Sequence, residues 1–500
     1  MHPPDRFIAR MPNTTYVTNF GRNLNLTPDR FYTPRSEQEV LEIMDRHAGK
    51  VIRCVGRLHS WSNILDCKDI MLDLKHLCDI QTGTDKTGNY AKVGAGCQIK
   101  YLIKQLSECR QWTLPSLGFI TEQTIAGAIS TGTHGSGKHS LSHYVQSVRL
   151  AIYDANSGRA VITEVNSGDE LRAARCSLGS LGVILSVQLE TRDAYRVEEQ
   201  FRQYSDIKDV LAAEADFPLQ QFYLVPWKWT YFAQQRRETT SKSSRHAWLY
   251  HQYRFWVFDV LMHLLILLLT RTRFPAVCTR FAFKWIIPAC VVQKWSVVAD
   301  SSTQLVMEHE LFHHIEMEIF VQRSKLPDAL SYLTNALTTM AGTQTESTSK
   351  MEDQTGSQPE TVFEHMQGKY CHHYPICIRK VQCDDTLISM SCRSADLSNP
   401  EGPWYSITLT NLHRGKQRTS FMEMMPILTH ELSIRYGGRT HWGKLFGMSG
   451  AQIRLLYPQL QKFLSIRERF DPAERFLNNW TKHCFSDHKA LPEPTGLPPT

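Results

Sequence analysis

A chain of 500 residues, 42% of them hydrophobic and 21% charged, is long enough to form two or three domains with cores of their own. The formal net charge is +7 and the pI is near 8.7, and the basic residues are spread along the chain except for a cluster near residues 236–254. This pattern excludes an intrinsically disordered protein and argues against a nucleic-acid partner.

The early elements alternate between strands and helices. A helix is expected where Pro34 and Ser36 precede apolar residues at helical spacing, and the segments around it are β-branched or turn-forming. We predict a helix at 34–48, strands at 51–56 and 70–77, a strand, glycine turn and helix at 91–109, and a hairpin at 146–164. This order predicts a compact α+β domain over the first 190 residues.

The later part of the chain differs in composition. Residues 195–340 are aromatic-rich and irregular. We predict a polar loop at 341–361, strands at 376–391 and 404–412 that pair with each other, helix near 453–470, and a loose Pro-rich tail after 486.

The longest apolar run, FWVFDVLMHLLILLLT at 255–270, is interrupted by Asp259 and His263 and falls short of the roughly 20 residues that a spanning helix needs. A second apolar patch follows, so that the apolar region extends over 255–292. The favoured interpretation is a buried helix in an irregular domain. The alternative is a segment that dips into an anionic membrane surface, since a basic stretch precedes it.

Thirteen cysteines at wide spacing, without a Cys-x-x-Cys pair, predict free thiols and a reducing compartment. Cys371, Cys377 and Cys383 lie near two histidines, but six-residue spacing on a strand suits a metal site poorly, so we expect no metal. The first 16 residues contain no apolar stretch of the kind found in secretory signals, and we therefore expect an intracellular protein.

Two glycine-bearing loops carry the chemistry. The first, VGRLHSWSN at 55–63, ends a strand in a turn whose backbone amides can converge on a phosphate. The second, LPSLGFITEQTIAGAISTGTHGSG at 114–137, mixes small residues with hydroxyls and allows the backbone to approach an extended ligand. Neither loop matches a Walker motif or a G-x-G-x-x-G turn, which disfavours ATP and NAD sites.

Together with SLGSLGVI at 177–184 and THWGKLF at 440–446, these loops resemble the aldonolactone oxidases of the vanillyl-alcohol-oxidase flavoprotein superfamily. The family includes gulonolactone and arabinonolactone oxidases, with alditol oxidases as more distant relatives. The resemblance implies an FAD-binding domain of the PCMH type at 1–193, a mixed-sheet substrate or cap domain at 194–430, a C-terminal helical segment at 431–485 that closes the flavin site, and a tail at 486–500.

The resemblance also implies roles for individual residues around FAD. His59 stands where oxidases of this family are bonded covalently to the C8-methyl group of the flavin. The backbone around it would hold the pyrophosphate through Gly56, Arg57, Leu58 and Ser60. The adenine and ribityl portions would be lined by Gly127, Ser130, Thr133, His134, Val183 and Ile184. Gly118 lies where relatives that react poorly with oxygen carry a larger side chain, which favours an oxidase.

Three further residues are implied on the substrate side. Ser116 would place a hydroxyl beside the substrate, Arg379 would orient the substrate's oxygens, and Lys444 would stabilise the reduced flavin from near its N1–C2 edge. His441 would bond in the same region. The sequence departs from the family's E-x-R motif because Cys377 stands in place of the glutamate.

Glu316 and Glu318 are two residues apart and would share one side of a strand, so either could replace that carboxylate. A solvated acidic face is the interpretation that we favour for them. The function expected overall is oxidation of a sugar-derived aldono-1,4-lactone, with transfer of electrons to molecular oxygen and release of hydrogen peroxide. The alternatives are an alditol or other carbohydrate oxidase, or a flavin-binding relative that has lost activity.

Overall fold

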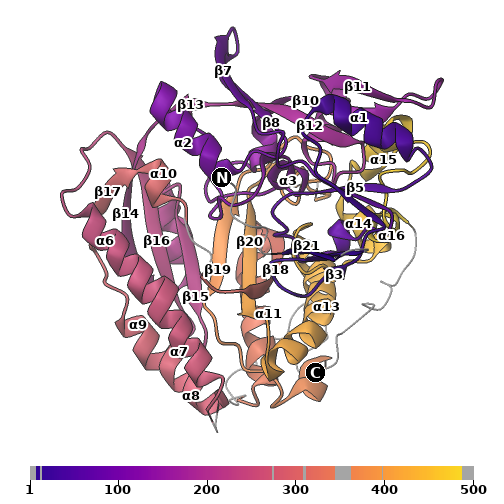
Figure 1. Cartoon of the computed structure of the whole chain (residues 1–500). Coiled ribbons are helices and arrows are strands. Elements are labelled where there is room, and N and C mark those ends of the chain that lie inside the picture. Colours follow the sequence, from indigo (N-terminus) through magenta and orange to yellow (C-terminus); the bar gives the residue numbers. More distant parts are fainter. Residues whose placement is uncertain are drawn as a thin grey trace.

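The computed structural model describes residues 7–11, 14–272, 275–307, 311–343, 362–396 and 398–486. Most of its strands belong to three sheets, of which the largest lies at the centre of the molecule (Figure 1). The mixture of helices and largely antiparallel sheets is the α+β architecture that the sequence predicts. Of the expected loop at 341–361 only the first three residues are described, and the tail after Ser486 lies outside the described residues.

A small parallel sheet begins the fold, with strand order β4-β6-β5. Its strands are β4 (Arg30–Tyr32), β5 (Ile52–Val55) and β6 (Ile70–Asp73). Helix α1 (Glu37–Arg46) begins after Ser36, whose side chain accepts a hydrogen bond from the amide of Glu39, as the predicted cap requires. The first glycine-bearing loop therefore leaves the carboxyl end of β5, where phosphate-binding turns of α/β units lie.

A five-stranded antiparallel sheet follows, in the order β11-β10-β12-β8-β7. Its strands are β7 (Ile80–Asp85), β8 (Gly88–Gly94), β10 (Val145–Tyr153), β11 (Ala160–Val165) and β12 (Val183–Glu190). The helices of this region are α2 (Ile99–Arg110), α3 (Ile125–Ser130) and α4 (Gly168–Arg175). The predicted hairpin at 146–164 is confirmed as the β10–β11 pair.

The central sheet has eight strands in the order β17-β14-β16-β15-β19-β20-β18-β21. They are β14 (Arg196–Tyr204), β15 (Gln221–Val225), β16 (Thr230–Thr239), β17 (Val297–Asp300), β18 (His314–Gln322), β19 (Ile376–Val381), β20 (Trp404–Leu412) and β21 (Arg439–Thr440). The predicted pairing of β19 with β20 is confirmed, although β19 ends at Val381 rather than continuing to 391.

One face of the central sheet is covered by α11 (Leu326–Met340) and α13 (Lys416–Tyr436), which contact β18 and β20. Ile315, Met317 and Ile319 of β18 point into this core. Because side chains alternate along a strand, Glu316 and Glu318 point to the opposite face. That opposite face lies toward the parallel sheet and the five-stranded sheet, and it carries the candidate site.

The C-terminal helices return to the beginning of the chain. They are α14 (Gly450–Leu456), α15 (Leu460–Phe470) and α16 (Asn479–Phe485), so the predicted helical segment is interrupted near Pro458. The buried Arg53 of β5 donates a hydrogen bond to the carbonyl oxygen of Phe476 at 2.7 Å. Asn478 donates in turn to the carbonyl of Asn63 at 2.9 Å. These bonds fasten the C-terminal segment behind the first glycine-bearing loop.

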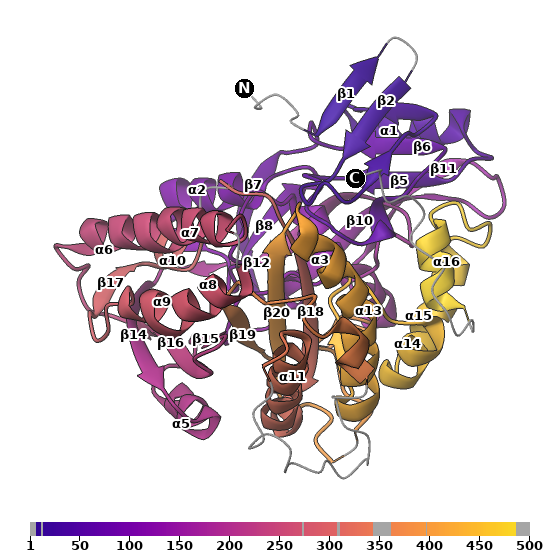
Figure 2. The ribbon, with the colours of Figure 1, turned by 90° about the horizontal axis from the view of Figure 1, so that it is seen from below.

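Two apolar helices lie side by side at the edge of the molecule, on the side away from α14, α15 and α16 (Figures 1 and 2). The first runs continuously through α6 (Ala247–Arg254), the π-helical η4 (Phe255–Leu261) and α7 (Met262–Leu269). The second comprises α8 (Pro275–Phe281), the π-helical η5 (Ala282–Ile286) and α9 (Ile287–Ala289). We call this pair the helical hairpin.

The expectation of a buried helix at 255–270 is wrong. The helix Ala247–Leu269 is long and apolar enough to cross a membrane by length and composition, and only 17% of its most apolar window is buried. The local sequence pattern could not reveal this exposure, because a helix that is apolar on all sides has the same sequence pattern whether protein or lipid surrounds it.

The remaining described elements are short. They are β1 (Ile8–Met11), β2 (Thr14–Thr18), β3 (Asn25–Leu26), β9 (Trp112–Thr113), β13 (Arg192–Asp193), α5 (Ile207–Ala212) and α10 (Ser301–Gln304), with 3₁₀ turns η1 (Asn63–Leu65), η2 (Leu141–Tyr144), η3 (Ala213–Ala215), η6 (Arg323–Lys325) and η8 (Glu364–Met366).

Candidate flavin and substrate site

A first cavity, the loop cavity, lies between the parallel sheet, the five-stranded sheet and the C-terminal segment. Its volume is about 960 Å³. It brings together nine residues predicted to hold the cofactor, namely Gly56, Arg57, Leu58, His59, Ser60, Gly127, Ser130, Val183 and Ile184. Residues of three of the four motifs, at 55–63, 114–137 and 177–184, thus converge on a single space, whereas none of 440–446 lines it.

The backbone of the first loop fits a phosphate-bearing ligand. Leu58 has a φ of 58°, in the left-handed region that non-glycine residues seldom occupy. A residue in this region within a turn can direct successive amides toward one point, which forms an anion-binding concavity. A Cβ on Gly56 would lie 2.3 Å from Oγ1 of Thr124, so only glycine allows the loop to lie this close to α3. The residues present therefore fit the pyrophosphate of a dinucleotide.

A second cavity, the sheet cavity, lies over the face of the central sheet opposite α11 and α13 and has a volume of about 1150 Å³. It shares its lining with the loop cavity at four residues, His59, Ser60, Gln123 and Thr131. A ligand that extends through both cavities would therefore pass His59 at their junction. The His59 ring stacks on Phe20 with centroids 5.1 Å apart, which fixes its orientation.

Strand register places a row of polar side chains across the floor of the sheet cavity. Glu318 of β18 faces Thr408 of β20, and Thr408 faces Cys377 of β19, which in turn faces Tyr223 of β15. All four residues line the cavity. Oγ1 of Thr408 is buried and has no hydrogen-bond partner among the described residues, so it is available to a ligand.

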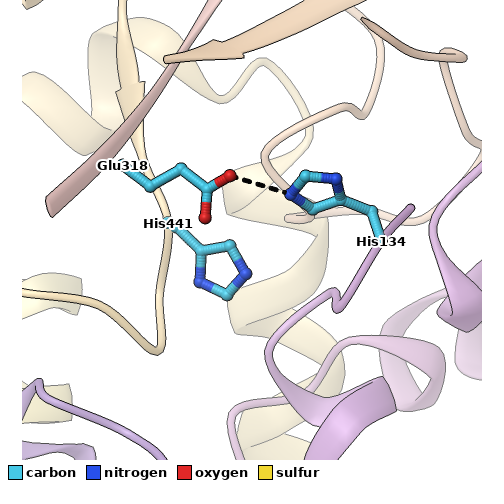
Figure 3. Close-up of side chains that lie close together, drawn as sticks. All are labelled: His134, Glu318 and His441. Carbon is cyan, nitrogen blue, oxygen red and sulfur yellow. Dashed lines mark hydrogen bonds and ion pairs between the residues drawn. The ribbon is translucent and has the colours of Figure 1, made fainter. Parts of the chain in front are cut away.

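His134, Glu318 and His441 lie at one end of this row (Figure 3). Nε2 of His134 is 3.1 Å from Oε1 of Glu318, and Nδ1 of His134 is 2.9 Å from the carbonyl oxygen of Gly135. A carbonyl oxygen only accepts hydrogen bonds, so Nδ1 of His134 carries a proton, and a further proton lies between Nε2 and Oε1 of Glu318. The two side chains therefore form a buried, hydrogen-bonded pair.

The electrostatics of this group follow from burial and from its neighbours. Burial alone would raise the pKa of Glu318, but its charge interaction and hydrogen bond with His134, together with the charge of Lys444, outweigh burial and hold that pKa well below its usual range. Burial lowers the pKa of His441 to about 3. His441 is therefore neutral near pH 7, and since its Nδ1 accepts a hydrogen bond from the amide of Gly443 at 3.0 Å, its proton is on Nε2.

The ligand atoms of His134, Glu318 and His441 lie within 4.8 Å of one another, which is close enough to hold a metal ion. A metal would need the lone pair of Nε2 of His134, where the bond to Glu318 requires a proton. The hydrogen-bonding pattern therefore favours a charge-paired polar cluster over a metal centre.

Lys444 forms the second ion pair of the cavity with Glu316, and its Nζ lies 4.2 Å from the centroid of the Trp61 ring. Oε1 of Glu316 also lies 3.2 Å from Nε2 of His314 and accepts from Thr410 at 3.2 Å. Burial would raise the pKa of Glu316, but Lys444 and His314 outweigh this effect and hold the pKa well below its usual range. Lys444 is thus an ion-paired cation rather than an isolated charge.

The interpretation of Glu316 and Glu318 as a solvated acidic face is wrong. Both side chains line the sheet cavity, and their exposed fractions are 15% and 2%. Their counter-charges come from Lys444 and His134, which are distant in sequence and could not be identified from the strand alone. The sequence had correctly placed the two carboxylates on one side of a strand.

Arg379 lies between two cavities and contributes to the lining of both. It lines the sheet cavity and also a smaller cavity of about 400 Å³ that contains Ser116. Ser116 itself does not line the sheet cavity, and its buried Oγ has no hydrogen-bond partner among the described residues. A Cβ on Gly118 would lie 2.9 Å from Cγ2 of Thr133, so the space left by this glycine is occupied by the threonine methyl group. Thr133 and His134 both line the sheet cavity.

A third large space, the apolar cavity, continues from the sheet cavity toward the helical hairpin. Its volume is about 850 Å³. Four residues, Phe119, Tyr223, Met262 and Pro375, line both spaces. The rest of the lining is mostly aromatic or aliphatic and includes Phe201, Val225, Phe232, Phe258, Ile287 and Val291. This cavity cannot be predicted from the sequence, because separate strands and helices contribute its lining residues one at a time.

All thirteen cysteines are free, as predicted. Cys371 and Cys377 are buried within the fold, and burial raises the pKa of both thiols.

The chain is similar to known enzymes over most of its length. Residues 28–159 match an FAD binding domain, and residues 187–484 match the D-arabinono-1,4-lactone oxidase family. A long-chain alcohol oxidase from an uncultured marine euryarchaeote is 45% identical over 466 residues, which cover 93% of this chain and 95% of that protein. The L-gulonolactone oxidase of Mus musculus is 26% identical over 486 residues, with 93% and 97% covered.

The fold is also that of a solved oxidase. A cholesterol oxidase from Brevibacterium sterolicum superimposes with a TM-score of 0.71 at 12% sequence identity, covering 97% of this chain and 99% of that one. The chain is thus an FAD-dependent oxidoreductase that acts on CH–OH donors, with the predicted α+β fold of the PCMH type. It belongs to the D-arabinono-1,4-lactone oxidase family.

Proposed function

We propose that this enzyme oxidises the alcohol carbon of a long, mainly apolar alcohol to the aldehyde and passes the electrons to oxygen, so that one alcohol and one O₂ give one aldehyde and one H₂O₂. The apolar cavity carries this proposal, because it opens from the polar sheet cavity and offers an aliphatic chain a largely hydrocarbon lining. The long-chain alcohol oxidase that is 45% identical to the chain supports the same substrate class.

In this proposal FAD extends through the loop cavity and the sheet cavity, because the two cavities share part of their lining. The loop at 56–60 would hold the FAD pyrophosphate, and His59 at the junction would be the covalent attachment point. Bound FAD supplies the hydride acceptor and the electrons for oxygen. We likewise propose the domain bounds 1–193, 194–430 and 431–485 given by the sequence.

The polar end of the substrate would meet the cluster at the end of the strand row. The Nε2–H of His441 and Arg379 would donate to the hydroxyl oxygen, and Glu318 would accept the hydroxyl proton. A carboxylate of such low pKa is a weak base. The departure of the hydride makes the hydroxyl far more acidic, however, so that proton transfer to Glu318 becomes favourable at that stage.

In this scheme three residues act on the reaction without contacting the substrate hydroxyl, namely Lys444, Glu316 and His134. Lys444 would bring positive charge to the flavin side of the cavity, with Glu316 fixing its position. His134 would hold Glu318 ionised and oriented. Ser116 would support Arg379 from the smaller cavity that both residues line.

An aldono-1,4-lactone remains a second candidate substrate. The concentration of hydrogen-bonding groups around Arg379, Thr408 and Thr410 favours it, since a lactone carries several oxygens. The gulonolactone oxidases, which match over almost the full chain, favour it as well.

A peroxide assay of the purified, flavin-loaded enzyme separates the candidates. Butan-1-ol, octan-1-ol, dodecan-1-ol, gulono-1,4-lactone, arabinono-1,4-lactone and an alditol would be compared under identical conditions. We expect kcat/KM to rise with chain length by about three- to fourfold per methylene, until the cavity is filled. Turnover of the lactone or alditol with none of the alcohols would refute the proposal.

A further inference from the structure

The helical hairpin has an inner face that lines a cavity and an outer face that is exposed. Its inner face supplies Phe258, Met262, Ile287 and Val291 to the apolar cavity. Its outer face exposes a set of large apolar side chains, Trp248, Leu249, Trp256, Leu261, Leu264, Leu268, Val277, Phe281, Trp285 and Ile286. These ten are most of the seventeen large apolar side chains that are exposed among the described residues. Such a concentration on two neighbouring helices is typical of an interaction surface, because exposed apolar residues are otherwise scattered singly.

The charge of the hairpin indicates its partner. Residues 241–295 contain eight lysines and arginines and a single acidic residue, Asp259, a net charge of +7 that equals the formal charge of the whole chain. Lys242 and Arg245 precede the first helix, Arg271 lies at its end, and Lys284 and Lys294 belong to the second arm, all five being exposed. Aromatic and aliphatic side chains bordered by cations suit an anionic lipid surface.

The first helix of the hairpin is fastened to the protein along its length. Tyr250 is fully buried and donates to Glu199 at 2.7 Å, while Nη1 of Arg254 lies 3.3 Å from the same carboxylate. Further along, Ile266 is fully buried. Crossing a bilayer would break these contacts and leave Glu199 short of partners. The contacts of the inner side therefore argue against a helix that crosses a bilayer and leave only the outer face free for a partner.

We propose that the outer face of the helical hairpin docks peripherally on an anionic lipid surface and that the apolar cavity beneath it receives the alcohol from that surface. The second half of this statement rests on the proposed function, whereas the docking does not. A substrate that enters from lipid would pass between the hairpin helices and the central sheet, and would reach the sheet cavity at Phe119, Tyr223, Met262 and Pro375. An apolar alcohol would then avoid transfer through water.

The test uses the flavin-loaded enzyme and sedimentation with phosphatidylcholine vesicles, with and without phosphatidylserine. We expect binding that phosphatidylserine strengthens. The variant L261N/L264N/L268N removes three exposed leucines and should weaken binding more than about tenfold. The variant R271E/K284E should lose roughly tenfold or more on anionic vesicles and change little on neutral ones.

The matched control is I434N/L455N, which removes two exposed apolar side chains from other helices and should bind as the parent does. Flavin content and melting temperature show that each variant is folded. Failure of the parent enzyme to bind vesicles would overturn the proposal, as would equal loss in the control. So would a dimer that shields Trp256 and Trp285 from a fluorescence quencher while vesicles are not bound.

Activity separates the docking from the proposed function. The leucine variant should lose turnover of dodecan-1-ol embedded in vesicles and keep turnover of dissolved butan-1-ol. Vesicle binding without oxidation of any alcohol would refute the proposed function and leave the docking intact. Equal loss on both alcohols would refute delivery from the lipid.

Discussion

Glu318 of β18 and His134 of the loop after α3 are 184 residues apart in the chain, and their side chains lie 3.1 Å apart in the buried part of the sheet cavity. This bond joins the central sheet to the second glycine-bearing loop. The position of this loop relative to the central sheet therefore depends on a buried polar pair whose members lie in two distant segments of the chain.

Replacement of Glu318 by glutamine should lower the rate of flavin reduction by alcohol about 10²- to 10⁴-fold, because the proton acceptor is removed while the shape is kept. Single-turnover absorbance measurements check the rate. Glu214→Gln is the matched control, since Glu214 is also a buried, ion-paired carboxylate but lines none of the cavities described. Equal slowing in both variants would assign Glu318 a structural role only.

Enlarging a side chain at the opening of the apolar cavity should select against long substrates. Met262→Trp places a bulky ring where the sheet and apolar cavities meet, and overpacking there costs about 1–3 kcal/mol, or roughly 5- to 150-fold in kcat/KM for dodecan-1-ol. Butan-1-ol should be turned over as before. Leu268→Trp, on the exposed face of the same helix, should leave both substrates unaffected.

Acid should destabilise the protein between about pH 6.5 and 4. Burial lowers the pKa of several histidines, most strongly to about 3 for His372 and His441 and to about 4 for His263 and His373. Their unfolded-state pKa is about 6.5, so the unfolded chain binds more protons in this window and the free energy of unfolding falls as pH falls. Each proton contributes about 1.4 kcal/mol per pH unit at most.

Melting temperatures measured across this window test the account of the histidines. His373→Asn should flatten the fall, whereas replacement of the exposed His246 should not alter its slope. A melting temperature that is constant from pH 6.5 to 4.5 would contradict the buried, neutral state of these rings.

Gly118→Ala should slow the reaction with oxygen more than it slows reduction by alcohol. The added Cβ would meet Thr133 at 2.9 Å, and Thr133 would have to move into the sheet cavity. We expect about a tenfold effect on oxygen consumption by the reduced enzyme, since small displacements near reacting groups are costly. Gly49→Ala, at a position with open space around it, is the control.

The sequence predicted the parts of the site that depend on local composition. The loop at 55–63 and the second loop at 114–137 were recognisable from their small and polar residues, and both line the cavities as expected. The one-sided placement of Glu316 and Glu318 followed from strand geometry. In each case the information lies within a few neighbouring residues.

Other features depend on long-range contacts and were missed for that reason. The burial of Glu318 depends on His134, and the cavity beneath the helical hairpin depends on Phe119, Tyr223 and Met262 from three separate parts of the fold. The exposure of the helix Ala247–Leu269 depends on which of its faces the central sheet covers. Hydrophobic periodicity cannot predict the covered face when a helix is apolar on all sides.

The most direct measurement is anaerobic mixing of the purified enzyme with dodecan-1-ol while the visible absorbance of its flavin is followed. The account predicts that the absorbance bleaches within single turnovers, that one aldehyde forms per flavin, and that admission of oxygen restores the colour with one H₂O₂. Bleaching by gulono-1,4-lactone but not by dodecan-1-ol or octan-1-ol would contradict the apolar-alcohol substrate and leave the lactone as the substrate of this site.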